Sequence, residues 1–169
     1  MPFIESFEPV IGTNPKVLIL GSIPGTASLQ AQQYYAHPRN AFWQIMANLF
    51  DVEWHDEYEL RIQQVRKLPV VLWDTLKACH REGSLDSAIL KDELEANDIV
   101  GLLKSHPGID LIAFNGAASE KYFKKTVSRL LTDEQQVDLK RLPSTSPAHA
   151  SKNFQQKLED WKVLMAYLR

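Results

Sequence analysis

The sequence predicts an α/β fold in which helices cover both faces of a four-stranded parallel sheet. Four short apolar runs alternate with segments whose apolar residues have helical spacing, and this alternation is typical of parallel sheets. The first run, residues 17–20, is apolar at every position, as expected for a strand buried on both faces. The 169 residues, 44% hydrophobic and 24% charged, have the size and composition of one globular domain. We therefore expect a single domain over residues 1–169.

The N-terminal part of the chain leads into the first strand and helix. Residues 1–15 contain three prolines among scattered apolar side chains, which suggests an irregular arm packed on the core. The first strand is expected at residues 16–20. A helix is expected at 41–50, because its apolar positions fall on one stripe. Asn40 stands at the start of that helix, and on local sequence alone we favour a capping role for its side chain.

The middle of the chain supplies the second helix and the second strand. Residues 56–68 are expected to form a helix, since Asp56 and Glu59 have the spacing of a capping box and a proline follows the segment. Residues 70–73 form the second predicted strand. This strand leaves Asp74 at the carboxyl edge of the sheet.

The rest of the chain continues the alternation of strands and helices. Residues 75–95 are punctuated by Gly, Ser and Asp, so we expect them to loop over the sheet edge with short helical turns. The later predicted elements are a helix at 97–105, a strand at 109–114, a helix from Gly116 to about Leu131, a strand at 137–142 and a final helix capped by Ser151.

The charge and cysteine content argue against several classes of protein. A net charge of −2 is unlike that of a nonspecific nucleic-acid coat, but it allows an enzyme that contacts DNA over a small patch. The single cysteine, Cys79, cannot form an internal disulfide or supply the thiolates of an iron–sulfur cluster. No apolar run reaches the length of a membrane span, and the N-terminus lacks a secretory signal. We expect a cytoplasmic protein with no metal, no cofactor and no membrane contact.

One stretch, residues 21–50, carries most of the side chains suited to binding and chemistry. The first strand runs into the turn GSxPG at 21–25, and open α/β sheets bind ligands at the carboxyl ends of their strands. The pattern YYxHPRNxFW follows at 34–43. It combines an amide with flat aromatic faces suited to a planar ligand.

These two patterns, with residues 72–74, 83–89 and 142–148, resemble the motifs of the uracil-DNA glycosylase superfamily. They are most similar to its hypoxanthine-DNA (deoxyinosine) glycosylase branch. The similar stretches occur in the expected order over nearly the whole chain. The resemblance implies a three-layer α/β/α sandwich with a central four-stranded parallel sheet, in agreement with the alternation of elements. It also implies an enzyme that flips a damaged base out of DNA and hydrolyses its bond to the sugar.

The resemblance makes Asn40 the catalytic residue. Many relatives place an Asn or Asp that positions the attacking water at the third residue of the turn, where this sequence has Ile23. In the hypoxanthine branch the asparagine of the His-Pro-x-Asn pattern has the essential role instead, and here that residue is Asn40. An amide is a poor base, so it would orient water and stabilise developing charge.

The base-binding residues implied by the resemblance are Phe42, Tyr35, Asp74, Ser22 and Gly21. Phe42 occupies the position of the ring on which the flipped base stacks, with Tyr35 as a second wall; the alternative is that Phe42 is a core residue. Asp74 would accept a hydrogen bond from the N–H of the base edge. Its alternative role is to cap the turn that follows it.

The DNA-binding residues implied by the resemblance gather mainly on the loop after the last strand. Hydroxyls and backbone amides of this loop suit phosphate contacts. Ala148 occupies the usual wedge position and is small, so His149 would compensate. Asn115 could contact a phosphate or tie down its own turn. The predicted DNA-binding set is Ser144, Ser146, His149, Asn115 and Lys152.

The function predicted from this resemblance is DNA repair by base excision. The enzyme would hydrolyse the N-glycosidic bond of a deaminated base, first hypoxanthine from deoxyinosine, and leave an abasic site. No lysine stands in a motif position where it could attack the sugar, so we expect a monofunctional enzyme. Its partner would be DNA that contains a damaged base, and we expect a monomer. The alternatives are a uracil or mismatch-specific uracil-DNA glycosylase, and a noncatalytic binder of nucleic acid or nucleotide on the same fold.

Overall fold

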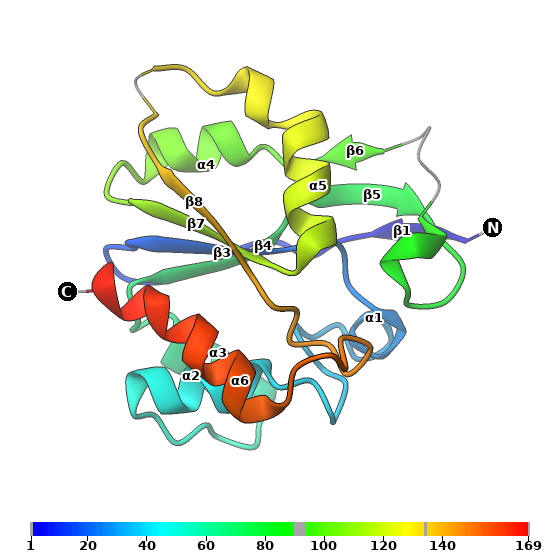
Figure 1. Ribbon diagram of the computed structural model, residues 1–169, viewed down its shortest axis with the longest axis vertical. Helices are drawn as coiled ribbons and strands as arrows, with labels where there is room; N and C mark the ends of the chain where they lie inside the picture. Colours follow the sequence, from blue (N-terminus) through cyan, green and yellow to red (C-terminus); the bar gives the residue numbers. More distant parts are fainter. Residues whose placement is uncertain (1, 90–93, 134, 169) are drawn as a thin grey trace.

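The parallel sheet expected from the sequence forms the centre of the protein (Figure 1). The computed structural model describes residues 2–89, 94–133 and 135–168. The main sheet has the strand order β2–β4–β3–β7–β8. Four of its strands are parallel, and the two-residue β2 adds an antiparallel edge to β4. The strand bounds are Val10–Ile11 (β2), Val17–Gly21 (β3), Val70–Asp74 (β4), Leu111–Asn115 (β7) and Asp138–Leu142 (β8).

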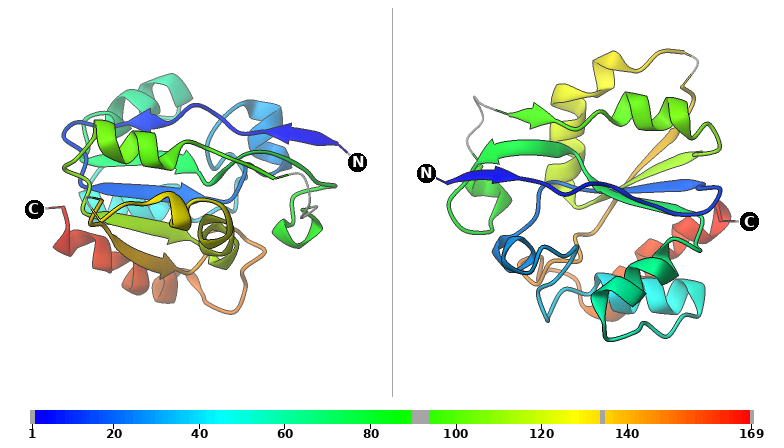
Figure 2. Two further views of the ribbon diagram at one scale, coloured as in Figure 1. Left: turned by 90° about the horizontal axis from the view of Figure 1, so that it is seen from above. Right: turned by 180° about the vertical axis from the view of Figure 1, so that it is seen from behind.

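Helices cover both faces of this sheet and make the α/β/α sandwich (Figures 1 and 2). The helix α6 packs with α2 and α3 on one face, while α4 and α5 cover the other. The helix bounds are Thr26–Ala31 (α1), Phe42–Phe50 (α2), Tyr58–Val65 (α3), Ile99–Ser105 (α4), Ala117–Thr126 (α5) and Phe154–Trp161 (α6), with 3-10 turns at Asp86–Ala88 (η1), Ser128–Leu130 (η2) and Lys162–Ala166 (η3). Within the described residues, none of these helices is long and apolar enough to cross a membrane.

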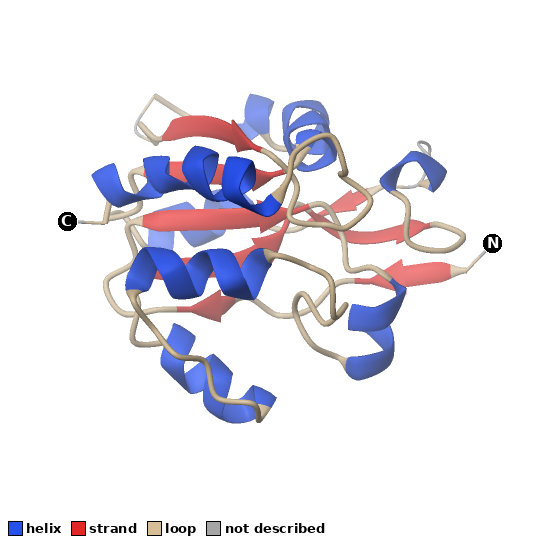
Figure 3. Ribbon diagram, turned by 60° about the horizontal axis from the view of Figure 1, so that its bottom comes forward, coloured by secondary structure: helices blue, strands red, loops and turns tan. Residues whose placement is uncertain are grey.

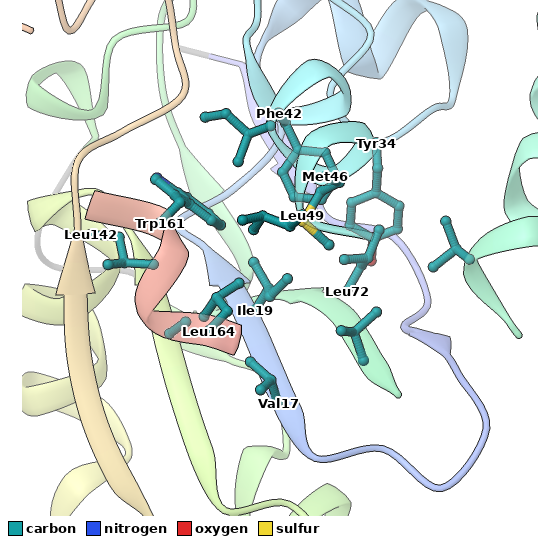
Figure 4. Close-up of a cluster of buried hydrophobic side chains, with 14 of the residues drawn as sticks. Val17, Ile19, Tyr34, Phe42, Met46, Leu49, Leu72, Leu142, Trp161 and Leu164 are labelled. Atoms are coloured by element: carbon teal, nitrogen blue, oxygen red, sulfur yellow. The ribbon is translucent and has the colours of Figure 1, made fainter. Parts of the chain in front are cut away.

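The central strand β3 supplies side chains to both hydrophobic cores. Val17 and Ile19 point into the core under α2 and α6, where Figure 4 shows them among Phe42, Met46 and Trp161. The intervening residues of β3, Leu18 and Leu20, pack into the opposite core under α4 and α5. Alternate side chains of a strand point to opposite faces, so a strand apolar at every position holds both layers together.

A second, three-stranded sheet lies beyond the main one and was not predicted. It has the order β1–β5–β6, with bounds Phe3–Glu5, Leu76–His80 and Glu95–Ala96. The predicted loop at 75–95 therefore contains strand β5, and the arm at 1–15 contains β1 and β2. Only the turn η1 matches the short helical turns expected there. Residues 90–93 of that predicted loop lie outside the described residues.

Two predicted helix caps are wrong. Asn153, not Ser151, caps α6, and its side chain and that of Gln156 form a reciprocal capping box. The helix α3 begins after Glu57 without a side-chain cap, so Asp56 and Glu59 form no capping box. The loop before α3 is fixed by a residue near the C-terminal end of the helix. Gln64 accepts the His55 N–H at 2.8 Å and donates to the Glu53 carbonyl at 2.9 Å.

The four parallel strands end on the same side of the molecule. Figure 3 shows their arrowheads pointing toward α1, η1 and the loop after β8. Gly21 is the register partner of Asp74 on β4, and Asn115 pairs with Leu142. The ends of β3, β4, β7 and β8 therefore present their following residues to one common region.

Candidate active site

A cavity of about 460 Å³ opens at the carboxyl ends of the parallel strands. Its wall comes from the turn after β3, the loop before α2, the ends of β4 and β7, the η1 loop and the loop after β8. The residues that line it are Phe7, Gly21, Ser22, Ile23, Pro24, Gly25, Thr26, Ala27, Ser28, Tyr34, Tyr35, His37, Arg39, Asn40, Asp74, Ser84, Leu85, Asp86, Asn115, Ser144, Thr145, Ser146, Pro147 and Ala148. Most of the predicted site residues are among them. Phe42, His149 and Lys152 are not.

Asp74 lies at the base of this cavity directly against Gly21. A Cβ placed on Gly21 would lie 2.5 Å from Asp74 Oδ1 and 3.5 Å from the Tyr35 hydroxyl, so the glycine makes room for both groups. The Asp74 residue is 5% exposed, and its Oδ2 has no hydrogen-bond partner among the residues that the structure describes. The turn that follows it is closed by backbone bonds and by Asn97, which donates to the Asp74 carbonyl at 2.8 Å. Because these contacts close the turn without the Asp74 side chain, Oδ2 of its carboxyl remains available to a ligand.

Burial makes the Asp74 carboxyl a weaker acid than usual. Desolvation is the main cause that raises its pKa to about 7, and the nearby carboxyl of Asp86 raises it further. The guanidinium of Arg81 opposes both effects. The Asp74 carboxyl can thus exist as the neutral acid or as the carboxylate near neutral pH, and such a shift in a cleft is a common mark of a functional site.

Arg81 and Asp86 are two charged residues of the site that sequence reasoning did not assign. Arg81 is 1% exposed and donates to the carbonyls of Gly83 at 2.8 Å and Pro24 at 2.5 Å. Asp86 accepts a 2.6 Å hydrogen bond from the Ser22 hydroxyl. The stretch 83–89 matched the family pattern, but only the tertiary contacts show that it is fastened to the turn after β3.

Tyr35, not Phe42, presents its ring at the cavity. The two rings are stacked with their centroids 3.9 Å apart and an interplanar angle of 23°. Phe42 is 0% exposed and packs edge-on to Trp161 in the core, so the structure does not place it on the cavity wall. Phe42 begins the apolar stripe of α2, and that stripe faces the sheet. Its ring therefore supports Tyr35 from behind.

Tyr35 combines a strained backbone with an unpaired hydroxyl. Its φ is 53°, in the left-handed region that residues other than glycine rarely adopt. Its hydroxyl is buried and makes no hydrogen bond of ordinary geometry within the described part of the chain. Burial raises the pKa of Tyr35, the charge of Asp74 adds to the rise, and the nearby Asn115 amide partly opposes it. The hydroxyl therefore keeps its proton at neutral pH and can donate it.

Asn40 stands on a turn that fixes its amide at the cavity edge. The Asn40 N–H donates to the His37 carbonyl at 2.9 Å, and the Arg39 N–H donates to His37 Nδ1 at 3.1 Å. Asn40 Oδ1 accepts the Phe42 N–H at 3.0 Å, the first amide of α2. Ala41, not Asn40, is the N-cap of α2, so the capping prediction is wrong in position. The Asn40 side chain still bonds the first helical N–H, and this bond orients its amide.

Asn115 ties the loop after β8 to the rest of the site. Its Oδ1 accepts the Thr145 N–H at 2.9 Å, and its Nδ2 donates to Thr145 Oγ1 at 3.0 Å. The Thr145 carbonyl in turn accepts the Ala41 N–H at 3.0 Å. Both polar ends of the Asn115 amide are used inside the protein, which supports the turn-tying alternative over a phosphate contact. This chain of bonds connects β7 to the residue beside Asn40.

The remaining predicted DNA-binding residues divide into two groups. Ser144 and Ser146 line the cavity, and their hydroxyls accept the N–H groups of Ser146 at 3.1 Å and Ala148 at 3.2 Å. His149 lies outside the cavity wall, with Nε2 3.3 Å from the hydroxyl of Ser151. Lys152 also lies outside it and pairs with Asp160 on α6, so its charge is partly neutralised. The structure therefore places the hydroxyls, and not these two basic residues, at the cavity.

The third residue of the turn after β3 offers no polar group. Ile23 is 6% exposed and packs with Ile4, Leu76 and Tyr122 in a third, smaller core. Any water-positioning group must come from another segment, and Asn40 on the loop before α2 is an amide in that neighbourhood. No group of three or more His, Cys, Asp or Glu side chains that could hold a metal ion occurs among the residues the structure describes.

Comparison with known proteins gives a consistent result. A family model described as the uracil DNA glycosylase superfamily matches residues 9–169. Hypoxanthine DNA glycosylase of Methanosarcina acetivorans is 36% identical over 158 residues, which cover 92% of this chain and 95% of the relative. Its namesake from Methanosarcina barkeri is 39% identical over 119 residues, or 70% and 74% of the two chains. The solution NMR structure of a candidate uracil DNA glycosylase from M. acetivorans superposes with a TM-score of 0.78 at 33% identity and covers 99% of each chain.

Proposed function

The chain belongs to the uracil-DNA glycosylase superfamily, and we propose that it is a DNA repair glycosylase that hydrolyses the N-glycosidic bond of deoxyinosine. The reaction releases hypoxanthine and leaves an abasic site. One observation carries the proposal: Asp74 Oδ2 and the Tyr35 hydroxyl, two buried polar atoms without partners, belong to residues that line one cavity. Buried polar atoms are nearly always paired, so two unpaired ones in one cavity wall point to a polar ligand.

The two unpaired atoms are complementary to the edge of hypoxanthine. The base presents an N1–H donor beside the O6 carbonyl. We assign Asp74 Oδ2 as the acceptor for N1–H and the Tyr35 hydroxyl as the donor to O6. Both atoms are shielded from water in the free protein, and active-site hydrogen bonds often reach their final geometry only when the substrate binds. A desolvated hydrogen bond of this kind is stronger than one exposed to water.

Asn40 acts on water rather than on the base. The attack on the sugar C1′ needs a water held in line with the breaking bond. Asn40 Oδ1 keeps a second lone pair beyond its bond to the Phe42 N–H, and that lone pair can accept a hydrogen bond from the water. An amide does not take the proton away. Its contribution is orientation and the stabilisation of developing positive charge on the sugar.

The cavity wall favours a monofunctional enzyme. A glycosylase that also cleaves the strand needs an amine to attack C1′ and form a covalent intermediate. No lysine is found among the described residues that line the cavity. The enzyme therefore delivers water to C1′ and stops at the abasic site. We further propose that the enzyme is a monomer and that it is located in the cytoplasm.

Two other functions remain as alternatives. Uracil has an N3–H beside a carbonyl, so the Asp74 and Tyr35 pair fits uracil as well as hypoxanthine. A noncatalytic binder on the same fold is favoured by one observation, the apolar Ile23 at the position where many relatives hold water. The substrate test must therefore separate hypoxanthine from uracil, and cleavage from binding.

The test is base release from one labelled oligonucleotide that carries deoxyinosine, deoxyuridine or deoxyxanthosine, followed by alkaline cleavage. Release from deoxyinosine above the other two supports the proposal. Release mainly from deoxyuridine keeps the superfamily chemistry and changes the substrate, and binding without release supports the noncatalytic alternative. Strand cleavage before alkali would refute the monofunctional assignment.

A further inference from the structure

Leu85 is an exposed apolar side chain at the rim of the cavity. It is 58% exposed and stands on the loop between β5 and η1. Among the described residues, it is the only strongly exposed large hydrophobic side chain that also lines the cavity. The full set of such exposed side chains is Phe3, Leu85, Leu130, Leu139, Phe154 and Met165.

Polar anchors on both sides hold Leu85 in place. Ser84 Oγ accepts the Thr26 N–H at 2.8 Å and donates to Thr26 Oγ1 at 2.7 Å. On the other side, Asp86 accepts the 2.6 Å bond from Ser22. These bonds fasten the loop to the turn after β3, whereas Leu85 between them extends from the protein. An apolar side chain kept in water by fixed neighbours suits contact with an apolar partner.

The loop after β8 offers no long apolar side chain at the cavity, and its His149, which was expected to compensate for Ala148, lies outside the cavity wall. Glycosylases that flip a base leave a gap in the stack, and apolar wedges are used by many proteins to fill or open such gaps. Ala148, which is exposed on that loop and lines the cavity, offers a single methyl group. Its neighbours Ser146 and Pro147 are short as well. The filling group must come from another part of the cavity rim.

We propose that Leu85 enters the base stack of duplex DNA at the position vacated by the flipped nucleotide. This inference rests on the proposed function, because it requires that a base leave the stack for the cavity. The adjacent Asp86 carboxyl accepts a hydrogen bond from the Ser22 hydroxyl, so it is held toward the turn after β3. In single-stranded DNA the base has no partner to leave and less stacking to lose, so the wedge is needed for duplex substrates alone.

The test compares Leu85→Ala with wild-type protein on the same deoxyinosine strand, either single-stranded or in a duplex. We expect the single-turnover rate on the duplex to fall at least tenfold, and the rate on the single strand to stay within twofold. Leu85→Met should restore most of the duplex rate, since it returns a long apolar side chain. Leu139→Ala is the matched control, because Leu139 is also exposed, at 41%, but lies on β8 outside the cavity.

A second readout separates this inference from the proposed function. A 2-aminopurine placed beside the deoxyinosine becomes brighter when its neighbour leaves the stack, whether or not the bond is cleaved. Leu85→Ala should reduce this signal in duplex DNA at saturating protein. Equal losses of the single-turnover rate on the single strand and the duplex would overturn the proposed role of Leu85. Full activity and full signal for Leu85→Ala would overturn it as well. If wild-type protein cleaves neither substrate, the proposed function fails, and the 2-aminopurine signal still decides the role of Leu85.

Discussion

Replacing Asp74 with asparagine should stabilise the folded protein at neutral pH, although it removes a proposed base-binding group. The Asp74 residue is 5% exposed, and burial and the Asp86 charge raise its pKa from 3.8 to about 7. One unit of pKa corresponds to about 1.4 kcal/mol, so ionising this carboxyl in the folded protein costs about 4 kcal/mol relative to the unfolded chain. Asparagine has nearly the same shape and carries no charge, so Asp74→Asn avoids this cost.

The stabilisation should depend on pH in a defined window. Below pH 3.8 the Asp74 carboxyl is protonated in both states and contributes no difference. Between pH 3.8 and about 7 the unfolded chain loses this proton while the folded protein keeps it. The contribution of Asp74 to the free energy of unfolding of the wild type therefore becomes more unfavourable as the pH rises. Above about pH 7 the full cost is present. Roughly 2.5 kcal/mol of the difference between the variants should accrue between about pH 5 and pH 8.

Urea unfolding of both proteins at these two pH values measures the effect. Asp133→Asn is the matched control, because Asp133 is an exposed aspartate. The difference in unfolding free energy between Asp74→Asn and wild type should grow with pH, while the control difference stays constant. A difference that is the same at both pH values would mean that Asp74 ionises in the folded protein as it does in the unfolded chain, and that burial does not raise its pKa.

Three further substitutions test other contacts of the site. Tyr35→Phe removes a buried hydroxyl without a partner, so urea unfolding should show equal or greater stability, while base release falls about tenfold for one lost hydrogen bond. Gly21→Ala puts a Cβ 2.5 Å from Asp74 Oδ1, so unfolding should show a loss of about 1–3 kcal/mol, with impaired base release. Asn115→Ala removes both bonds to Thr145 and should cost about 2–3 kcal/mol in the same assay. Wild-type stability for either of the last two would contradict the packing described above.

The main sheet could be predicted from the sequence because its strands carry local signals. Strand β3 is apolar at every position because both of its faces are buried. Helix α2 has a single apolar stripe because only one of its faces packs on the core. Strand β5 has no such signal. Its five residues, LKACH, form no continuous apolar run, and its partner β1 lies more than 70 residues earlier in the chain, with Phe3 opposite His80. Pairing between distant segments is decided by tertiary structure, so the second sheet was missed.

The sequence predicted the site residues whose position depends only on the order of the strands. It missed those whose position depends on side-chain packing. Asp74 and Asn115 follow strands of one parallel sheet, so the sequence already indicates that they share an edge. The network of Arg81 and Asp86 was missed because it depends on a loop folding back onto the turn after β3. Phe42 was assigned to the base although its own helical stripe indicated burial, and the packing of α2 decided in favour of the core.

Asn40 is the residue to which we assign catalysis of base release in this cavity. The most direct measurement is single-turnover release of hypoxanthine from a deoxyinosine oligonucleotide by wild type and Asn40→Ala, with the binding affinity measured on the same DNA. Asn48→Ala is the matched control, since Asn48 is an exposed asparagine on α2 away from the cavity. Asn40→Ala should bind the oligonucleotide like wild type and release the base at least a hundredfold more slowly, while Asn48→Ala should be unchanged. Normal release by Asn40→Ala would contradict this assignment.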